Sequence, residues 1–146
     1  MNNKVTISIE GLDNKGPDYL SLTEKTEPFV LSVLNNLEKH NWDLSVFFCN
    51  NDIIKKLNKQ YRNLDESTDV LSFIMGEMAG ERFLPGDIVI SLEKLLENAG
   101  DFGVSPEEEL RRLLVHGILH LSGMDHATNN EKEPMLVFQE KLLAEI

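Results

Sequence analysis

SPEEELRRLLVHGILHLSGMDH occupies residues 105–126 and joins a helix start, a long helix and three histidines in one stretch. Ser105 at the N-cap and Pro106 at the first helical position, followed by glutamates, form a strong helix-start signal. The helix is expected to run to about Ser122, where Gly123 supplies the left-handed conformation that ends it. Because its leucines and isoleucine recur at helical spacing, one face of this helix must pack against the rest of the chain. We therefore expect the fold to be built around it.

The three histidines follow the pattern H-x-x-x-H-x-x-G-x-x-H. His116 and His120 are one helical turn apart, which puts their Cβ atoms about 5–6 Å from each other on one face. Gly123 permits the turn that brings His126 back toward them. Three imidazoles leave one tetrahedral position open, which is typical of a catalytic zinc site and not of a closed structural one. We predict one divalent metal ion on these three histidines, with zinc favoured, although imidazole also suits nickel and other borderline ions.

The residue after the first histidine departs from the best-known use of this spacing. Metalloproteases with the pattern H-E-x-x-H have a glutamate there as general base, whereas this chain has Gly117. Losing a positioned base typically costs about 10²–10⁴ in rate, so peptide hydrolysis by the usual route is disfavoured. Phosphodiester cleavage depends more on stabilising charge at the phosphate, and it requires a cation beside the metal.

A basic stripe in an acidic chain provides candidates for that cation. Lys55, Lys59 and Arg62 stand at i, i+4 and i+7 of a predicted helix and are candidate substrate-binding residues. The lysines are equally compatible with a solvated helix face. Arg62 is also a candidate catalytic residue, because a guanidinium matches phosphate oxygens in pairs. The second candidate catalytic residue is Asp125, which either orients a metal ligand or accepts a proton.

Composition limits the class of protein. A chain of 146 residues suits one domain with one core. The first residues do not resemble a secretory signal, and no apolar run is long enough to cross a membrane. Cys49 is the only cysteine, so no disulfide can form within the chain, which suits a reducing compartment. We therefore expect a cytoplasmic protein. The net charge of −11 argues against a general nucleic-acid binder but allows a local basic patch.

The remaining elements follow from hydrophobic periodicity and turn residues. Strands are expected over 5–9, 44–49, 70–74 and 88–90, with loops over 11–17 and 75–85. Helices are expected over about 28–40, from an N-cap at Asn51 to about Arg62, from Ser91 to about Ala99 before Gly100, from Ser105 to about Ser122, and around Met135, Phe138 and Leu142. The expected fold class is α+β, a single domain with a mixed, roughly four-stranded sheet packed with about five helices.

Several blocks of sequence together resemble a known family. They are LNKQYR at 57–62, TDVLSF at 68–73, GDIVIS at 86–91, HGILHLSGMDH at 116–126, and a closing helix with Met135 and Gln139-Glu140. Their order and spacing resemble the YbeY family of bacterial endoribonucleases and rRNA maturation factors, from about Cys49 to the end of the chain. One departure is Ile74, where family members often have proline at the exit from a strand.

The resemblance implies that residues 1–146 form a single YbeY-like metal-dependent hydrolase domain. It implies zinc on His116, His120 and His126, an important role for Arg62, and hydrolysis of single-stranded RNA. The implied biology is maturation of the 3′ end of 16S ribosomal RNA and ribosome quality control. The implied partners are ribosomal RNA and the small ribosomal subunit or its associated proteins, and no membrane. The acidity of the chain suggests that such a partner provides part of the affinity for RNA.

Two other functions stay open at this point. A non-catalytic ribosome-assembly factor can use the metal site for stability or docking, although the open coordination position favours catalysis. A zinc peptidase is disfavoured by Gly117. Thr68, Asp69 and Ser72 either line the cleft or only shape the entrance to a strand.

Overall fold

A computed structural model describes residues 2–12 and 17–146, and within them five helices and one four-stranded sheet. In chain order the elements are β1 (Lys4–Ile9), α1 (Pro17–Asn36), β2 (Asp43–Cys49), α2 (Asn51–Arg62), β3 (Val70–Ala79), β4 (Arg82–Ser91), α3 (Leu92–Phe102), α4 (Pro106–Leu121) and α5 (Pro134–Glu145). The sheet has the order β1-β2-β4-β3, with β3 antiparallel to β4 and the other pairs parallel. This mixed sheet with its helices confirms the predicted α+β class and the single domain.

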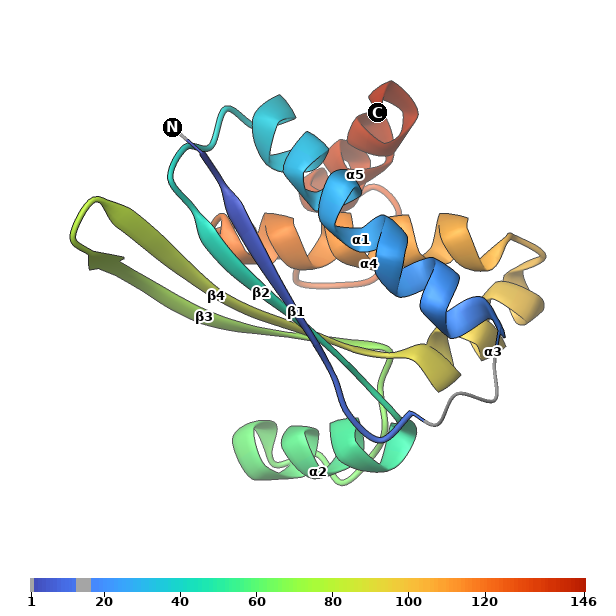
Figure 1. Cartoon of the computed structure of the whole chain (residues 1–146). Helices are drawn as coiled ribbons and strands as arrows, with labels where there is room; N and C mark the ends of the chain where they lie inside the picture. The colour runs from blue at the N-terminus through green and yellow to red at the C-terminus, as the bar shows by residue number, and fades with distance from the viewer. Residues whose placement is uncertain (1, 13–16) are drawn as a thin grey trace.

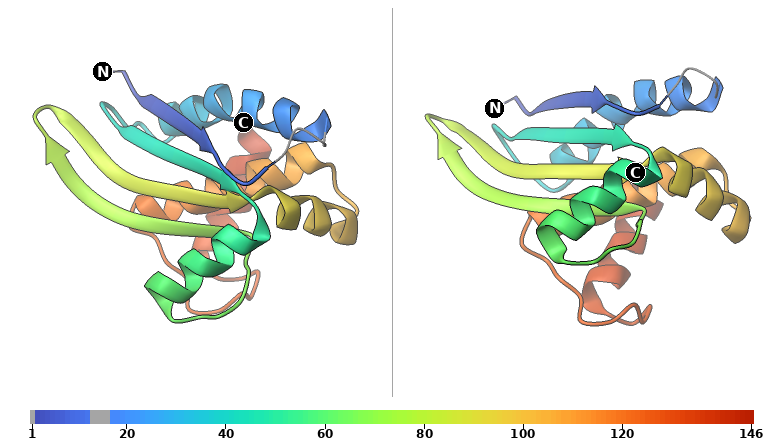
Figure 2. Two further views of the ribbon diagram at one scale, coloured as in Figure 1. Left: turned by 60° about the horizontal axis from the view of Figure 1, so that its bottom comes forward. Right: turned by 90° about the horizontal axis from the view of Figure 1, so that it is seen from below.

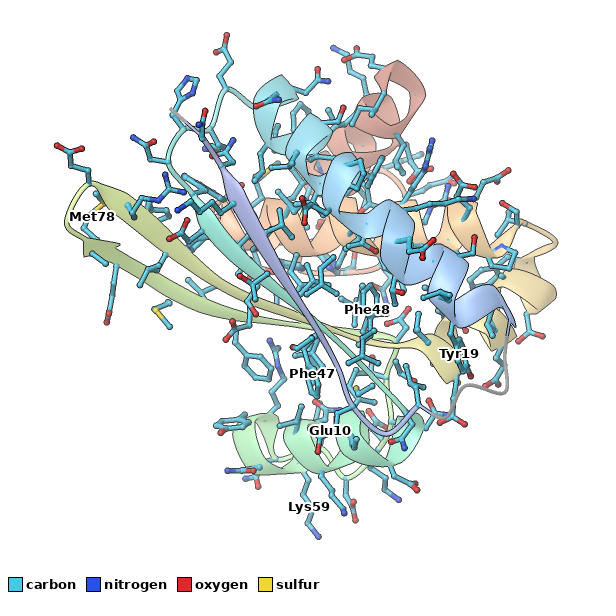
Figure 3. The ribbon with its side chains drawn as sticks, viewed as in Figure 1. Glu10, Tyr19, Phe47, Phe48, Lys59 and Met78 are labelled. Atoms are coloured by element: carbon cyan, nitrogen blue, oxygen red, sulfur yellow. The ribbon has the colours of Figure 1, made fainter. Side chains whose placement is uncertain are left out.

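The helices are divided unequally between the two faces of the sheet. Figure 1 shows α1, α3, α4 and α5 on one face and α2 on the other. Successive residues of a strand point to opposite faces, and Figure 3 shows this for Phe48, which points toward α1 and α4, and Phe47, which points toward α2. The main hydrophobic core therefore lies beneath the four helices, and a smaller one lies beneath α2.

The main core depends on a close approach of α4 to the sheet. Leu114 and Ile118 of α4 and Ile88 of β4 are fully buried there. Gly117 faces the sheet so closely that an added Cβ would lie 2.9 Å from Cδ1 of Ile88 and 3.0 Å from Cγ1 and Cγ2. The glycine is thus explained by packing, because any side chain at this position would collide with the sheet.

The segment predicted as a loop over 75–85 forms the outer half of a long hairpin instead. β3 continues to Ala79 and β4 begins at Arg82, so the predicted ends of both strands were wrong. A two-residue turn with Gly80 at a φ of 63° joins them. The pairing slips between Ile74 and Glu77, which marks a β-bulge. Periodicity missed the outer part of β3 because its residues, from Ile74 to Ala79, are exposed and show no buried apolar face.

The ends of three helices also differ from those predicted. α1 begins at Pro17 and ends at Asn36, whereas apolar spacing indicated about 28–40. Its first half buries few apolar residues, and Thr26, which is buried, donates its hydroxyl to the Leu22 carbonyl at 2.9 Å. A buried polar residue whose hydroxyl bonds to its own helix adds nothing to the hydrophobic periodicity from which a helix is predicted.

The ends of α2 and α3 differ by smaller amounts. Asn50, not Asn51, is the N-cap of α2 and accepts from the Ile53 amide. α3 passes through Gly100 and ends with Gly103 in the left-handed conformation. Part of the loop predicted over 11–17 lies outside the described residues. No helix of the described residues is long and apolar enough to cross a membrane.

Candidate active site

The three histidines come together at the C-terminal end of α4. His116 and His120 lie on its last two turns, and Gly123, with a φ of 100°, lets the chain turn back with His126. Their ring centroids lie 4.6 Å apart for His116 and His120, and 5.2 and 5.3 Å from each of these to His126. One nitrogen from each ring lies within 4.8 Å of the others. The spacing in the sequence therefore produces the cluster that it predicted.

The hydrogen bonds of the rings determine which nitrogen of each is free. Nδ1 of His120 contacts the Met124 carbonyl oxygen at 3.1 Å, and Nδ1 of His126 contacts the Thr128 carbonyl oxygen at 2.8 Å. Carbonyl oxygens only accept, so each Nδ1 carries the hydrogen and each Nε2 keeps a lone pair. The Nε2 atoms of His116 and His120 lie 3.1 Å apart, close to the separation of two ligands of one tetrahedral ion. Two lone pairs facing each other at this distance fit a shared divalent metal.

His116 is oriented by a side chain from α5, Gln139, which the sequence marked only as part of the closing family block and not as a residue of the site. Gln139, which is buried, places Oε1 2.8 Å from Nδ1 of His116 and directs Nε2 to Oε2 of Glu140 at 3.2 Å. The carboxylate fixes the amide orientation, because a carboxylate can only accept. Arg112 in turn donates to both oxygens of Glu140 at 2.9 and 3.3 Å. This chain of contacts sets the tautomer and direction of His116, as is usual for metal-binding histidines.

Electrostatics also favour the form of the histidines that binds metal. Burial lowers the pKa of His116, although the hydrogen bond that it donates to Gln139 opposes this. Burial likewise lowers the pKa of His120, and His116 and His126 lower it further. A lowered pKa favours neutral imidazole, which is the form that donates a lone pair to a metal.

Arg62 joins the histidines across a cleft of about 400 Å³. It comes from the last turn of α2, and its Nη2 donates to the Ser72 carbonyl of β3 at 2.9 Å. The cleft is lined by residues of α2, of β3 and of the end of α4, namely Arg62, Val70, Leu71, Ser72, Ile74, His116, His120, Gly123, Met124 and Asp125. The structure thus places a cation in one cleft with His116 and His120, two candidate metal ligands, from a part of the chain 54 positions before His116 (116 − 62).

The remaining candidate residues are Asp125, after the turn, and Lys55 and Lys59 of the basic stripe, and they lie at different places. Asp125 lines the cleft, is largely exposed, and places Oδ1 3.8 Å from Nδ1 of His120. Lys55 and Lys59 are exposed and are not among the cleft-lining residues. Figure 3 shows Lys59 pointing away from the sheet, and it forms an exposed ion pair with Asp65 at 3.8 Å.

Thr68, Asp69 and Ser72 were expected either to line the cleft or to shape the entrance to a strand, and the structure gives different residues different roles. Asp69 accepts from the Val70 amide at 2.8 Å and from Asn98 at 3.2 Å, which fixes the beginning of the strand. Thr68 donates to the same carboxylate at 3.3 Å. Ser72 lines the cleft and its carbonyl positions Arg62. Ile74 also lines the cleft and lies inside β3, so the predicted strand exit at this residue is wrong.

Comparisons with known proteins agree with the resemblance seen in the sequence. A family model described as Endoribonuclease YbeY matches residues 12–146. The chain is 49% identical to Endoribonuclease YbeY of Treponema denticola, over 98% of this chain and 93% of that protein. It is 47% identical to the protein of the same name from Treponema pallidum strain Nichols, over 98% of this chain and 89% of that protein. These matches confirm the resemblance and the enzyme class that it implied.

A solved structure has the same fold. The chain superposes on the solution structure of TM1509 from Thermotoga maritima with a TM-score of 0.58 and 31% sequence identity. The match covers 97% of this chain and 87% of the other. The arrangement of sheet and helices is therefore shared with a protein of known structure.

Proposed function

The chain belongs to the endoribonuclease YbeY family, and from this we propose that it is a metal-dependent endoribonuclease that cleaves single-stranded RNA. We propose further that residues 1–146 form one hydrolase domain and that zinc is the metal. In this proposal the protein acts in the cytoplasm, in maturation of the 3′ end of 16S ribosomal RNA and in ribosome quality control. Its partners are ribosomal RNA and the small ribosomal subunit or its associated proteins.

One observation carries the proposal, which is that Arg62 lines the same cleft as His116 and His120, two of the three clustered histidines. The Ser72 carbonyl uses one N–H of the guanidinium, and the ring of Phe73 lies 5.9 Å from its central carbon. An arginine has five N–H donors, so others stay free for phosphate oxygens. A guanidinium held in this way favours a substrate with a phosphate group and not a peptide.

The roles of the side chains follow from their positions. His116, His120 and His126 would hold the metal, which when bound supplies stabilisation of phosphate charge and makes water more acidic. Arg62 binds the phosphate that bears the charge developing during cleavage. Asp125 is the proposed proton acceptor, or it orients His120 across the 3.8 Å that separates them.

The packing of Gly117 weighs against a peptidase. The position that carries the general base in metalloproteases faces Ile88 in the core, where a glutamate has no room. The cleft therefore lacks that base for a physical reason, and the phosphate-directed chemistry of Arg62 is the better-supported use of the site.

The test is cleavage of a defined single-stranded RNA that a chelator abolishes and added zinc restores. We expect His120→Ala to abolish cleavage and Arg62→Glu to reduce it at least about 100-fold, since losing one donor that stabilises developing charge costs about 10²–10³. His40→Ala replaces an exposed histidine outside the site, and Lys141→Glu makes the same change of charge on α5. Both controls are expected to cleave like the wild type.

The outcomes of this test separate the candidate functions. Unchanged cleavage by His120→Ala protein, purified free of other nucleases, refutes the nuclease. Binding to small ribosomal subunits without cleavage supports the assembly factor instead. The predicted role of Lys55 and Lys59 is tested by the salt dependence of RNA binding, whose slope decreases when a phosphate contact is lost.

A further inference from the structure

A second cavity lies on the opposite face of the sheet from the histidine cleft. It has a volume of about 470 Å³ and is lined by Ser45, Phe47, Leu57, Tyr61, Phe73, Asp87 and Val89. Ser45, Asp87 and Phe73 are register partners on β2, β4 and β3, so their side chains form one row across this face. We call this cavity the aromatic pocket.

The aromatic pocket lies where the sheet face is left open. α2 packs over the end of the sheet near Cys49 and Val89, with Ile54 between them in the smaller core. Figure 2, in the view from below, shows the strands extending past α2 toward the β3–β4 hairpin with no described helix over them. Tyr61, on the last turn of α2, stands at the edge of this open region with 61% of its surface exposed.

The aromatic side chains present surfaces on which a nucleobase can stack. The rings of Tyr61 and Phe73 meet edge to face with centroids 5.3 Å apart, and Phe47 is partly exposed beside them. Proteins that bind single strands place bases on exposed aromatic rings of this kind next to a cationic group. Here the cationic group is Arg62, whose guanidinium carbon lies 5.9 Å from the Phe73 ring centroid.

The carboxylate of Asp87 in the aromatic pocket favours binding of a base over binding of a phosphate. Asp87 is half-buried, and its carboxylate makes no hydrogen bond or ion pair with another side chain of residues 2–12 and 17–146. A carboxylate repels phosphate and accepts N–H groups from a base edge. Guanine presents two adjacent N–H donors on its Watson–Crick edge, whereas uracil presents one N–H between two carbonyl oxygens. The pocket is therefore chemically suited to guanine and unsuited to uracil.

The aromatic pocket and the histidine cleft lie next to each other at the edge of the sheet and are lined by neighbouring residues of α2 and β3. Residues 72–74 of β3 form the wall between them, with Ser72 and Ile74 facing the cleft and Phe73 facing the pocket. Arg62 lies at the rim, lines the cleft, and bonds to the Ser72 carbonyl. A strand of RNA with a phosphate at Arg62 can therefore place the base of a neighbouring nucleotide around the edge of β3.

We propose that the aromatic pocket binds a base of the single-stranded RNA substrate, next to the cleavage point, and prefers guanine there. The assignment of this base to a substrate rests on the proposed function. Tyr61 and Phe73 provide the stacking surface, Asp87 the hydrogen-bond acceptor, and Arg62 the link to the scissile phosphate.

The test measures binding and cleavage on the same protein samples. Binding of fluorescent oligouridylates, with and without one central guanosine, is measured by anisotropy in chelator, which prevents cleavage. We expect Tyr61→Ala to weaken binding about 5- to 100-fold, as loss of one stacked base does. Phe102→Ala is the matched control, because Phe102 is 65% exposed on α3 and lies outside the pocket. Asp87→Asn is expected to remove the preference for guanosine while binding of the all-uridine strand is retained.

The results distinguish failure of the pocket from failure of the nuclease. The pocket is refuted if Tyr61→Ala binds like Phe102→Ala, if guanosine gives the wild type no advantage, or if the wild type binds neither strand. Equal binding by these variants together with normal cleavage would leave the nuclease intact and indicate a protein partner for the pocket. Binding that depends on Tyr61, in a protein that cleaves nothing when zinc is restored, would refute the nuclease and support the pocket.

Discussion

The packing of Gly117 against Ile88 makes a quantitative prediction about stability. Replacing glycine by alanine inside a helix normally stabilises it by about 0.5–1 kcal/mol, because the unfolded chain loses freedom. At Gly117 the new methyl group would lie 2.9–3.0 Å from three carbon atoms of Ile88. Ile88 is fully buried and branched at Cβ, so its side chain has little room to turn away.

The clash is expected to outweigh the gain in helix propensity. Forcing an extra carbon into a well-packed core costs about 1–3 kcal/mol. After the helix gain is subtracted, Gly117→Ala should lower the free energy of unfolding by up to about 2 kcal/mol. Gly117→Glu must also bury a carboxylate, which adds several kcal/mol, and we expect that variant to be largely unfolded.

Urea denaturation followed by circular dichroism measures these effects. The matched control is Gly100→Ala, since Gly100 lies within α3 and an added Cβ there meets nothing within 4 Å. That variant should be stabilised. In a double-mutant cycle, Ile88→Val removes Cδ1 and should relieve part of the clash, giving a favourable coupling of about 0.5 kcal/mol or more. If Gly117→Ala stabilises the protein as much as Gly100→Ala does, the close approach of α4 to the sheet is refuted.

Three further predictions concern other contacts. Gln139→Ala should weaken zinc binding about 10- to 100-fold in a chelator competition, and unchanged affinity would mean that the contact with His116 does not orient the ring. The hydrogen bond from Arg82 lowers the pKa of Asp43, so the pair stabilises the folded protein at pH values above the pKa of Asp43 in the unfolded chain. This contribution is lost as the pH falls through the lower pKa of the folded state. Arg82→Gln should therefore flatten the acid side of the curve of unfolding free energy against pH, measured by urea denaturation. Burial raises the pKa of the Cys49 thiol to about 12, so iodoacetamide at about pH 8, near the ordinary thiol pKa, should label it only in urea, and rapid labelling of the native protein would contradict this burial.

The sequence predicts the histidine site well because its geometry is local. A helix places His116 and His120 together, and one glycine returns His126 within six residues of the second. Arg62 was a candidate from the basic stripe and from the affinity of a guanidinium for phosphate, and the resemblance to a family supported it. Its position beside the histidines depends on the order of the strands, which brings the end of α2 to the edge of β3. The contact between Gln139 and His116 spans 23 residues and leaves no pattern in either helix.

The hairpin was missed for a different physical reason. Hydrophobic alternation reveals a strand only when one of its faces is buried, and the outer half of β3 is exposed on both. Met78, near its tip, is 63% exposed and projects from the end of the hairpin (Figure 3). Such a strand is held by its backbone hydrogen bonds to β4 and by the contacts that β4 makes, such as the rings of Trp42 and Phe83, whose centroids lie 5.2 Å apart. Hydrophobic periodicity along β3 does not reveal either kind of contact.

The small size of Gly117 bears on two features of the cleft, the absence of the protease general base and the position of Arg62. Because Gly117 has no side chain, α4 can approach β4 so closely that no room remains for a Cβ beside Ile88. The end of α4 then also packs beside β3, and the cleft between them is narrow enough for Arg62 to share a wall with His116. A glutamate at this position would hold the helix away from the sheet and separate the two. The residue that excludes the usual peptidase mechanism therefore helps to assemble the cleft in which we propose that phosphate binds.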